Sequence, residues 1–267
     1  MRNEPTPPGR RGSGMEPVFR TLEIAVSMAT RAIGTRITYY GLENIPERGG
    51  AVIAINHTSY LDWFPSALAA YQRRRRMRFM IKSEMQNVKF VNFLIKHSGT
   101  IPVDRHAGGG AYAIAVERLR AGEIVGVYPE ATISRSFELK EFKSGAARMA
   151  RDAEVPIVPM IVWGAQRIWT KDHPRNLGRK KIPVTVAVGP PLNAAESVDE
   201  TSAAMREAMN ALLRRVQQEY PHLEGAYWVP RRLGGSAPTM DEAKALEEAE
   251  LAERARRRAE RDTKSRR

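Results

Sequence analysis

The chain contains no cysteine among its 267 residues. This absence excludes disulfide bonds, thiolate ligands for a metal and a cysteine nucleophile. Long apolar runs are also lacking, because no stretch approaches the roughly 18 uncharged residues that a spanning helix needs. Aromatic residues make up only 7% of the chain, and basic residues do not alternate with them as they do in proteins that stack nucleic-acid bases. We therefore expect neither a spanning helix nor a nucleic-acid partner.

Several short catalytic motifs are missing too. The chain has no G-x-S-x-G elbow, no H-E-x-x-H and no Walker loop. Four histidines show no metal-ligand spacing: His97, His106, His173 and His222. We therefore expect no metal site.

A strong positive charge is present instead. The formal net charge is +13 and the isoelectric point is about 10.2. Such a chain attracts anionic partners, which include phospholipid headgroups, phosphorylated small molecules and nucleic acid. The charge alone does not choose among them.

The two ends of the chain differ from its middle. Residues 1–15 are rich in Pro, Gly and Arg and predict a disordered leader. Residues 16–40 predict an amphipathic helix with basic residues on its polar side, suited to a membrane interface, although an ordinary surface helix has the same pattern. Residues 233–267 are nearly all Ala, Glu, Arg and Lys, with acidic residues first and arginines last. That composition predicts a charged helical or disordered tail.

Between these ends, residues 41–232 predict one α/β domain. Apolar runs expected as strands alternate with helical patterns, which favours a mostly parallel central sheet flanked by helices. The expected strands are 51–55, 78–82, 100–103, 124–128, 157–163 and 184–188. The expected helices are 62–71, 110–121, 144–153 and 197–218.

The sharpest chemical signal is Asn56-His57-Thr58-Ser59-Tyr60-Leu61-Asp62, which directly follows the strand at 51–55. Catalytic groups gather at the carboxyl edge of parallel strands. A carboxylate on the Nδ1–H of His57 would leave Nε2 as a base. Residues five apart are about 140° apart on a helix, so Asp62 must fold back toward His57 through a turn. Alone, this spacing is common, and a structural histidine is the default interpretation.

Three further segments follow in order: Gly99-Thr-Ile-Pro-Val-Asp-Arg105, Val127-Tyr-Pro-Glu-Ala-Thr-Ile-Ser134 and Val155-Pro-Ile-Val-Pro159. Together with the His57 motif, they resemble the four motifs of the lysophosphatidic acid acyltransferase family, the PlsC-like glycerolipid acyltransferases. The resemblance covers residues 16–192. It implies the glycerolphosphate acyltransferase-like fold and a membrane-associated enzyme of phospholipid biosynthesis, peripheral or monotopic on the cytoplasmic face of the cell membrane.

The resemblance also implies roles for individual residues. His57 is the general base on the acceptor hydroxyl, oriented by Asp62. Arg105 and Lys82 bind the acceptor's phosphate, and Glu130 helps hold the acceptor. The donor is acyl-CoA or acyl-carrier protein, with no cofactor, no metal and no acyl-enzyme. The acceptor is a lysophospholipid, 1-acyl-glycerol 3-phosphate, acylated at its sn-2 hydroxyl.

The third segment departs from the common Phe-Pro-Glu-Gly-Thr-Arg-Ser pattern of the family. Ala131 replaces Gly, which requires either negative φ or backbone strain. Ile133 replaces an Arg that usually contacts phosphate, so either Arg135 or Lys143 substitutes for it, or the headgroup differs. The alternatives are another acceptor, such as glycerol 3-phosphate, a larger lysophospholipid or a glycolipid precursor, or a non-catalytic basic protein that binds membranes or nucleic acid.

Overall fold

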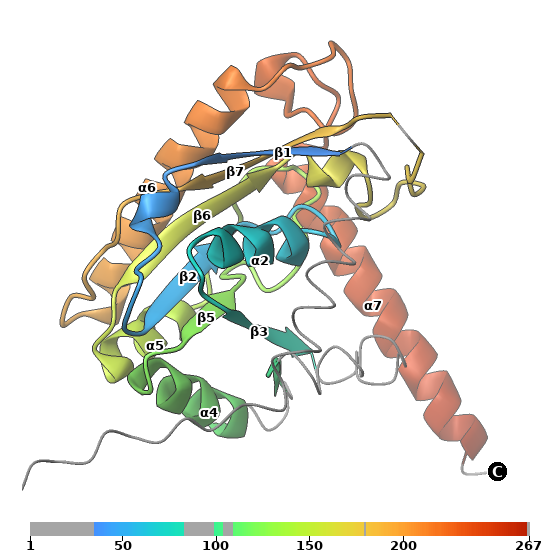
Figure 1. The fold of residues 1–267 in the computed structure, drawn as a ribbon. Helices are drawn as coiled ribbons and strands as arrows, with labels where there is room; N and C mark the ends of the chain where they lie inside the picture. Colours follow the sequence, from blue (N-terminus) through green and yellow to red (C-terminus); the bar gives the residue numbers. More distant parts are fainter. Residues whose placement is uncertain (1–34, 83–98, 104–108, 179, 266–267) are drawn as a thin grey trace, which may run out of the picture.

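A seven-stranded sheet forms the centre of the molecule (Figure 1), in the order β1-β7-β6-β2-β5-β3-β4. The computed structural model describes residues 35–82, 99–103, 109–178 and 180–265. All neighbouring strands run parallel except β6 and β7, which are antiparallel. The strands are β1 (Arg36–Tyr40), β2 (Ala51–Ile55), β3 (Met77–Lys82), β4 (Ile101–Val103), β5 (Ile124–Val127), β6 (Ile157–Trp163) and β7 (Pro183–Val188).

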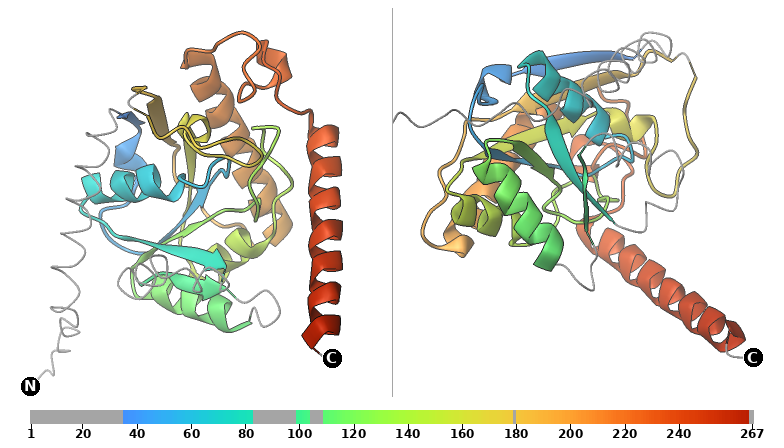
Figure 2. Two further views of the ribbon diagram at one scale, coloured as in Figure 1. Left: turned by 90° about the vertical axis from the view of Figure 1, so that its right-hand side faces the viewer. Right: turned by 60° about the horizontal axis from the view of Figure 1, so that its bottom comes forward.

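Helices cover both faces of this sheet (Figures 1 and 2). They are α2 (Trp63–Gln72), α4 (Gly109–Arg120), α5 (Gly145–Ala153), α6 (Val198–Glu219) and α7 (Met240–Ser265), with short 3-10 turns η1 (Leu42–Asn44), η3 (Ala165–Arg167) and η4 (Arg231–Leu233). Strand β2 is buried along its whole length, and its residues alternate between two apolar cores. Val52 and Ala54 join the core under α4, α5 and α6, whereas Ile53 and Ile55 join the core under α2. This double burial explains why β2 is a continuous apolar run.

The predicted α/β architecture is confirmed. Each predicted strand and helix of residues 41–232 is present, and its ends lie within one residue of the prediction. The central strands were predictable because they are short, continuous apolar runs.

The prediction of a helix through residue 40 is wrong at its end. Residues 36–40 form strand β1, which pairs with β7 at the edge of the sheet. Its sequence, Arg-Ile-Thr-Tyr-Tyr, consists mainly of β-branched and aromatic residues that favour a strand. Residues 16–34 of the predicted helix, like the leader at 1–15, lie outside the described residues.

The C-terminal segment is helical as α7, and it is attached to the domain. Ala237 and Ala243 are buried, so the α/β domain extends past the predicted boundary at residue 232. A Cβ atom at Gly235 would collide with the carbonyl oxygen of Val229, which shows how closely this connection packs. In the ranges that the structure describes, no helix has both the length and the apolarity needed to cross a bilayer.

Candidate active site

The turn after β2 is anchored to β6 by Asn56. This residue is fully buried, and its amide forms two hydrogen bonds with the backbone of Val162. The Oδ1 atom accepts from Val162 N at 2.7 Å, and Nδ2 donates to Val162 O at 3.0 Å. The side chain thus continues the pairing of β2 with β6 for one more residue. His57 follows at the carboxyl edge of the sheet.

His57 and Asp62 contact each other, as predicted. His57 Nδ1 lies 3.2 Å from Asp62 Oδ2. The same oxygen accepts from the backbone N–H groups of Thr58 and Ser59, both at 2.7 Å. Asp62 therefore holds the whole turn, and the sharing of one oxygen among three donors accounts for the rather long distance to the imidazole.

Two opposing effects act on the Asp62 carboxyl, and the net result is a raised pKa. The side chain is completely buried, and burial raises the pKa of Asp62, but hydrogen bonds from His57, Ser59 and Thr58 oppose that rise. Asp62 directly precedes α2, whose amino terminus attracts negative charge. A carboxylate here places the proton of neutral His57 on Nδ1, which leaves Nε2 unprotonated. The His57 side chain is 20% exposed.

Glu130 connects the third motif to His57. Its Oε1 accepts from His57 N at 2.8 Å, and its Oε2 accepts from Lys140 N at 3.1 Å. Ser134 N donates to His57 O at 2.7 Å. Both backbone groups of His57 are therefore held by the segment that starts at Glu130. Burial raises the pKa of Glu130 to about 7, against the effect of these two hydrogen bonds.

The raised pKa of Glu130 predicts a pH-dependent stability. In the unfolded chain this carboxyl titrates near 4.5 and in the folded protein near 7. Between these values the folded state binds a proton that the unfolded state does not, so the free energy of unfolding falls as the pH rises, by up to about 3 kcal/mol. Glu130→Gln lacks this titration. Urea unfolding should show the wild type losing stability relative to the variant between pH 5 and pH 8, and a constant difference over that range would contradict the assignment.

Tyr128 and Ala131 shape the same loop. The Tyr128 ring stacks on the His57 imidazole, with centroids 4.1 Å apart and planes at 22°. Burial raises the pKa of Tyr128 well above its ordinary value, so a neutral phenol supports the ring. Ala131, which replaces the family's Gly, has a φ of 60°. The predicted alternative of backbone strain is therefore the one that the structure contains.

Substitution of Ala131 measures this strain. Strain from a non-glycine residue in the left-handed region lowers the free energy of unfolding by about 1–2 kcal/mol. Glycine removes this strain, but it lowers the free energy of unfolding by about 0.5–1 kcal/mol because it gives the unfolded chain more conformational entropy. Ala131→Gly should therefore change the free energy of unfolding by no more than about 0.5 kcal/mol. The matched control, Ala113→Gly, lies at an exposed position inside α4 and should cost about 1 kcal/mol. An equal loss in the free energy of unfolding for both variants would contradict the backbone strain at Ala131.

The residues predicted to bind the acceptor are only partly brought together. Lys82 ends β3 at the same edge of the sheet as His57, and Arg105 lies outside the described residues. Lys143 has an exposed side chain, and its backbone N donates to Pro129 O at 2.9 Å. Arg135 is bound to two carboxylates, Asp172 at 2.5 Å and Glu250 at 2.8 Å.

Sequence reasoning missed the contribution of α7 and of Lys140 and Lys171. A pocket of about 370 Å³ lies between the His57 motif and α7; its lining residues include Tyr60, Arg135, Lys171 and Glu250. These residues are far apart in the chain, so only the clustering of acidic residues in the first half of α7 could have indicated the contact.

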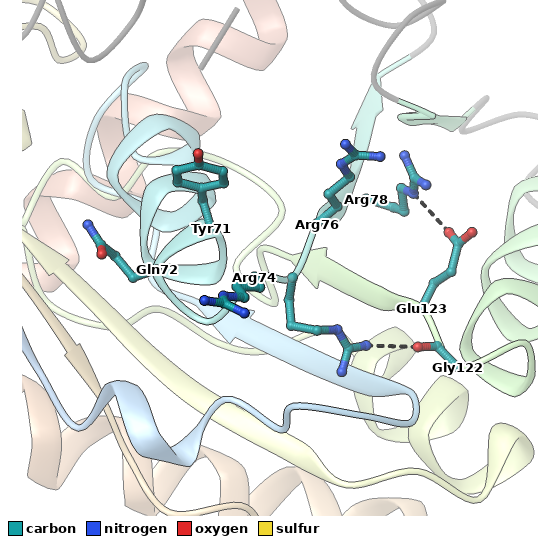
Figure 3. Close-up of a pocket in the computed structure, with 8 residues that line it drawn as sticks. Tyr71, Gln72, Arg74, Arg76, Arg78, Gly122 and Glu123 are labelled. Atoms are coloured by element: carbon teal, nitrogen blue, oxygen red, sulfur yellow. Dashed lines mark hydrogen bonds and ion pairs between the residues drawn. The ribbon is translucent and has the colours of Figure 1, made fainter. Parts of the chain in front are cut away.

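A larger pocket, of about 620 Å³, lies at the opposite edge of the sheet (Figure 3). Its lining includes Arg74, Arg75 and Arg76, which precede β3, and Arg78 within β3. Arg75 donates to Gly122 O at 2.8 Å, and Arg78 donates to Glu123 at 2.8 Å. Arg75 also donates to two further carbonyl oxygens, those of Pro46 and Gly49. This arginine therefore joins the loops at the amino ends of the strands, away from His57. Among the described residues, no group of three or more His, Asp or Glu side chains could hold a metal ion.

Comparisons with known proteins identify relatives of the chain. A family model described as Acyltransferase matches residues 36–163, the range that contains His57, Asp62 and Glu130. The chain is 27% identical over 195 residues to a 1-acyl-sn-glycerol-3-phosphate acyltransferase of Bacillus subtilis, covering 70% of this chain and 91% of the relative. It is also 27% identical over 217 residues to a probable 1-acyl-sn-glycerol-3-phosphate acyltransferase of Mycoplasma pneumoniae, covering 76% of this chain and 77% of the relative.

The fold is shared with a solved structure. The crystal structure of the 1-acyl-sn-glycerophosphate acyltransferase PlsC from Thermotoga maritima superposes with a TM-score of 0.65, over 78% of this chain and 83% of that chain, at 21% identity. That likeness concerns the fold alone. The chain thus carries an Acyltransferase domain at residues 36–163 and is similar to 1-acyl-sn-glycerol-3-phosphate acyltransferases.

Proposed function

We propose that this protein transfers a fatty acyl group from a thioester donor, acyl-CoA or acyl-carrier protein, to the sn-2 hydroxyl of a 1-acyl-glycerol 3-phosphate. The observation that carries the proposal is the His57–Asp62 contact at the carboxyl edge of the sheet, with the imidazole partly exposed. The names of the relatives support the same acceptor. The enzyme acts at the cytoplasmic face of the membrane, where its net charge of +13 favours anionic lipid.

The proposed reaction uses His57 as base and then as acid. Nε2 takes the proton of the acceptor hydroxyl while the oxygen attacks the thioester carbonyl. The tetrahedral intermediate collapses, the new ester forms, and the C–S bond breaks. The proton on Nε2 passes to the departing thiolate. Asp62 stabilises the imidazolium between these two steps, and Tyr128 and Glu130 keep the ring and its backbone in place.

The third motif favours a second candidate acceptor. Ile133, in place of the family's Arg, is buried, and Arg135 is bound by two carboxylates. An acceptor phosphate must therefore displace a carboxylate from Arg135 or bind Lys82 and Arg105 instead. A lysophospholipid with a larger headgroup is the alternative that this difference supports.

The test is an assay of labelled palmitoyl-CoA against a panel of acceptors, with the position of the new ester determined. The panel holds 1-acyl-glycerol 3-phosphate, glycerol 3-phosphate and lysophosphatidylinositol. We expect the highest kcat/KM for the first, acylated at sn-2. A preference for another acceptor would overturn the acceptor assignment, and binding to anionic vesicles without turnover of any acceptor would overturn the catalytic role.

A further inference from the structure

The acidic first half of α7 lies against the loop of the third motif. Residues 240–250 carry five Asp or Glu and one Lys, whereas residues 251–265 carry six Arg or Lys and three Asp or Glu. The second half projects from the body of the molecule (Figures 1 and 2), and residues 251–260 are exposed. The described hydrogen bonds of Glu247 and Glu250 with the domain lie in the acidic half.

Glu247 makes the contact nearest to the catalytic turn. Its Oε1 accepts from Thr132 Oγ1 at 2.6 Å, and its Oε2 accepts from Lys140 Nζ at 2.9 Å. Lys140 Nζ also donates to Thr132 Oγ1, which closes a triangle of three side chains. The Lys140 and Glu247 side chains are only 17% and 27% exposed, so this ion pair is shielded from water more than a typical surface pair.

The triangle is connected to His57 through Glu130. Lys140, held at its side chain by Glu247, donates its backbone N–H to Glu130 Oε2. The other carboxylate oxygen of Glu130 accepts from His57 N. Thr132 lies on the other side of the strained Ala131, so Glu247 holds both ends of the loop that presents Glu130. A loop with a strained residue keeps its conformation only when its surroundings fix it.

Glu250 fixes α7 one turn further on. It accepts from Arg135 at 2.8 Å and from Lys171 at 3.0 Å, and it also pairs with Arg254. Burial alone would raise the pKa of Glu250, but the hydrogen bonds from Lys171 and Arg135 lower it to about 2. Glu250 therefore remains charged at neutral pH. Its contacts fix α7 in a position that places Glu247 beside Thr132 and Lys140.

We propose that Glu247 is a positioning residue for acyl transfer, acting through Lys140 and Glu130 on His57. This role rests on the proposed function, and it makes α7 part of the active site rather than a solvated tail. Glu247 touches neither substrate nor the reacting atoms. Its effect should therefore fall on kcat, because the loop it holds sets the placement of His57 in the transition state.

The test compares Glu247→Gln with Glu248→Gln, which removes the same charge from an exposed neighbour on α7. We expect kcat of Glu247→Gln to fall about tenfold, as for loss of a charge-assisted hydrogen bond, with KM of donor and acceptor within about twofold of wild type. Glu248→Gln should have the wild-type kcat. Rates are measured well below each variant's Tm, so that a loss of folded protein does not enter them.

A charge exchange, Lys140→Glu with Glu247→Lys, provides the rescue. It keeps the ion pair and the backbone N–H that Glu130 accepts, and we expect kcat to return to within about threefold of wild type. A kcat of Glu247→Gln equal to that of Glu248→Gln, or a failure of the exchange to restore kcat in a folded protein, would overturn the positioning role. Absence of acyl transfer by the wild type would instead overturn the proposed function, and the positioning role with it.

Discussion

Replacement of His57 by alanine should lower kcat for acyl transfer about a thousandfold, which is the usual scale for loss of a general base together with its proton delivery. The folded protein should persist, because the His57 side chain is 20% exposed and the hydrogen bonds of its backbone to Glu130 and Ser134 do not involve the imidazole. The measurement is the initial rate with palmitoyl-CoA and 1-acyl-glycerol 3-phosphate.

The matched control is His173→Ala. His173 also stacks on a tyrosine, Tyr227, at a centroid distance of 3.8 Å, but it has no carboxylate partner among the described residues. Both variants therefore lose a histidine that stacks on a tyrosine, so any effect of that loss alone should appear in both. A residual rate of His57→Ala close to that of His173→Ala would show that His57 is structural.

Replacement of Asp62 by asparagine should lower kcat to a similar degree. The asparagine oxygen can still accept from Thr58 N and Ser59 N, so the turn survives. What is lost is the negative charge that stabilises the imidazolium, and we expect kcat to fall by about two to four orders of magnitude with KM little changed.

Asp62→Ala separates the structural from the catalytic contribution. Alanine leaves the two backbone N–H groups without an acceptor in a buried site, and we expect the free energy of unfolding to fall by about 2–4 kcal/mol. Asp62→Asn should be much more stable than Asp62→Ala, as measured by urea unfolding. A stable Asp62→Asn protein with kcat within tenfold of wild type would contradict the role of the charge.

The fold was largely predictable because its central strands are buried on both faces. β2 and β6 are uninterrupted apolar runs that are buried along their whole length. β1 was missed because it lies at the sheet edge and is only partly buried, so its pattern shows no apolar run.

The contact between His57 and Asp62 was predictable from their place after a buried strand, whereas the supports of the turn were not. His57 and Asp62 lie five residues apart, and the position after a buried strand implies that they meet. The contacts of Thr132 and Arg135 with α7 join residues 115 apart in sequence. Such contacts depend on where the chain returns after the sheet is complete, which no local pattern specifies. The resemblance to the family did not indicate them either, because it ends before α7.

The most direct test of the account measures free CoA released from palmitoyl-CoA, with and without acceptor, on the scale of a single turnover. In the proposed mechanism, His57 activates the acceptor hydroxyl and no acyl-enzyme forms. CoA should therefore appear only when 1-acyl-glycerol 3-phosphate is present, in equal amount to the ester product. A burst of CoA stoichiometric with enzyme in the absence of acceptor, with label retained on the denatured protein, would contradict it.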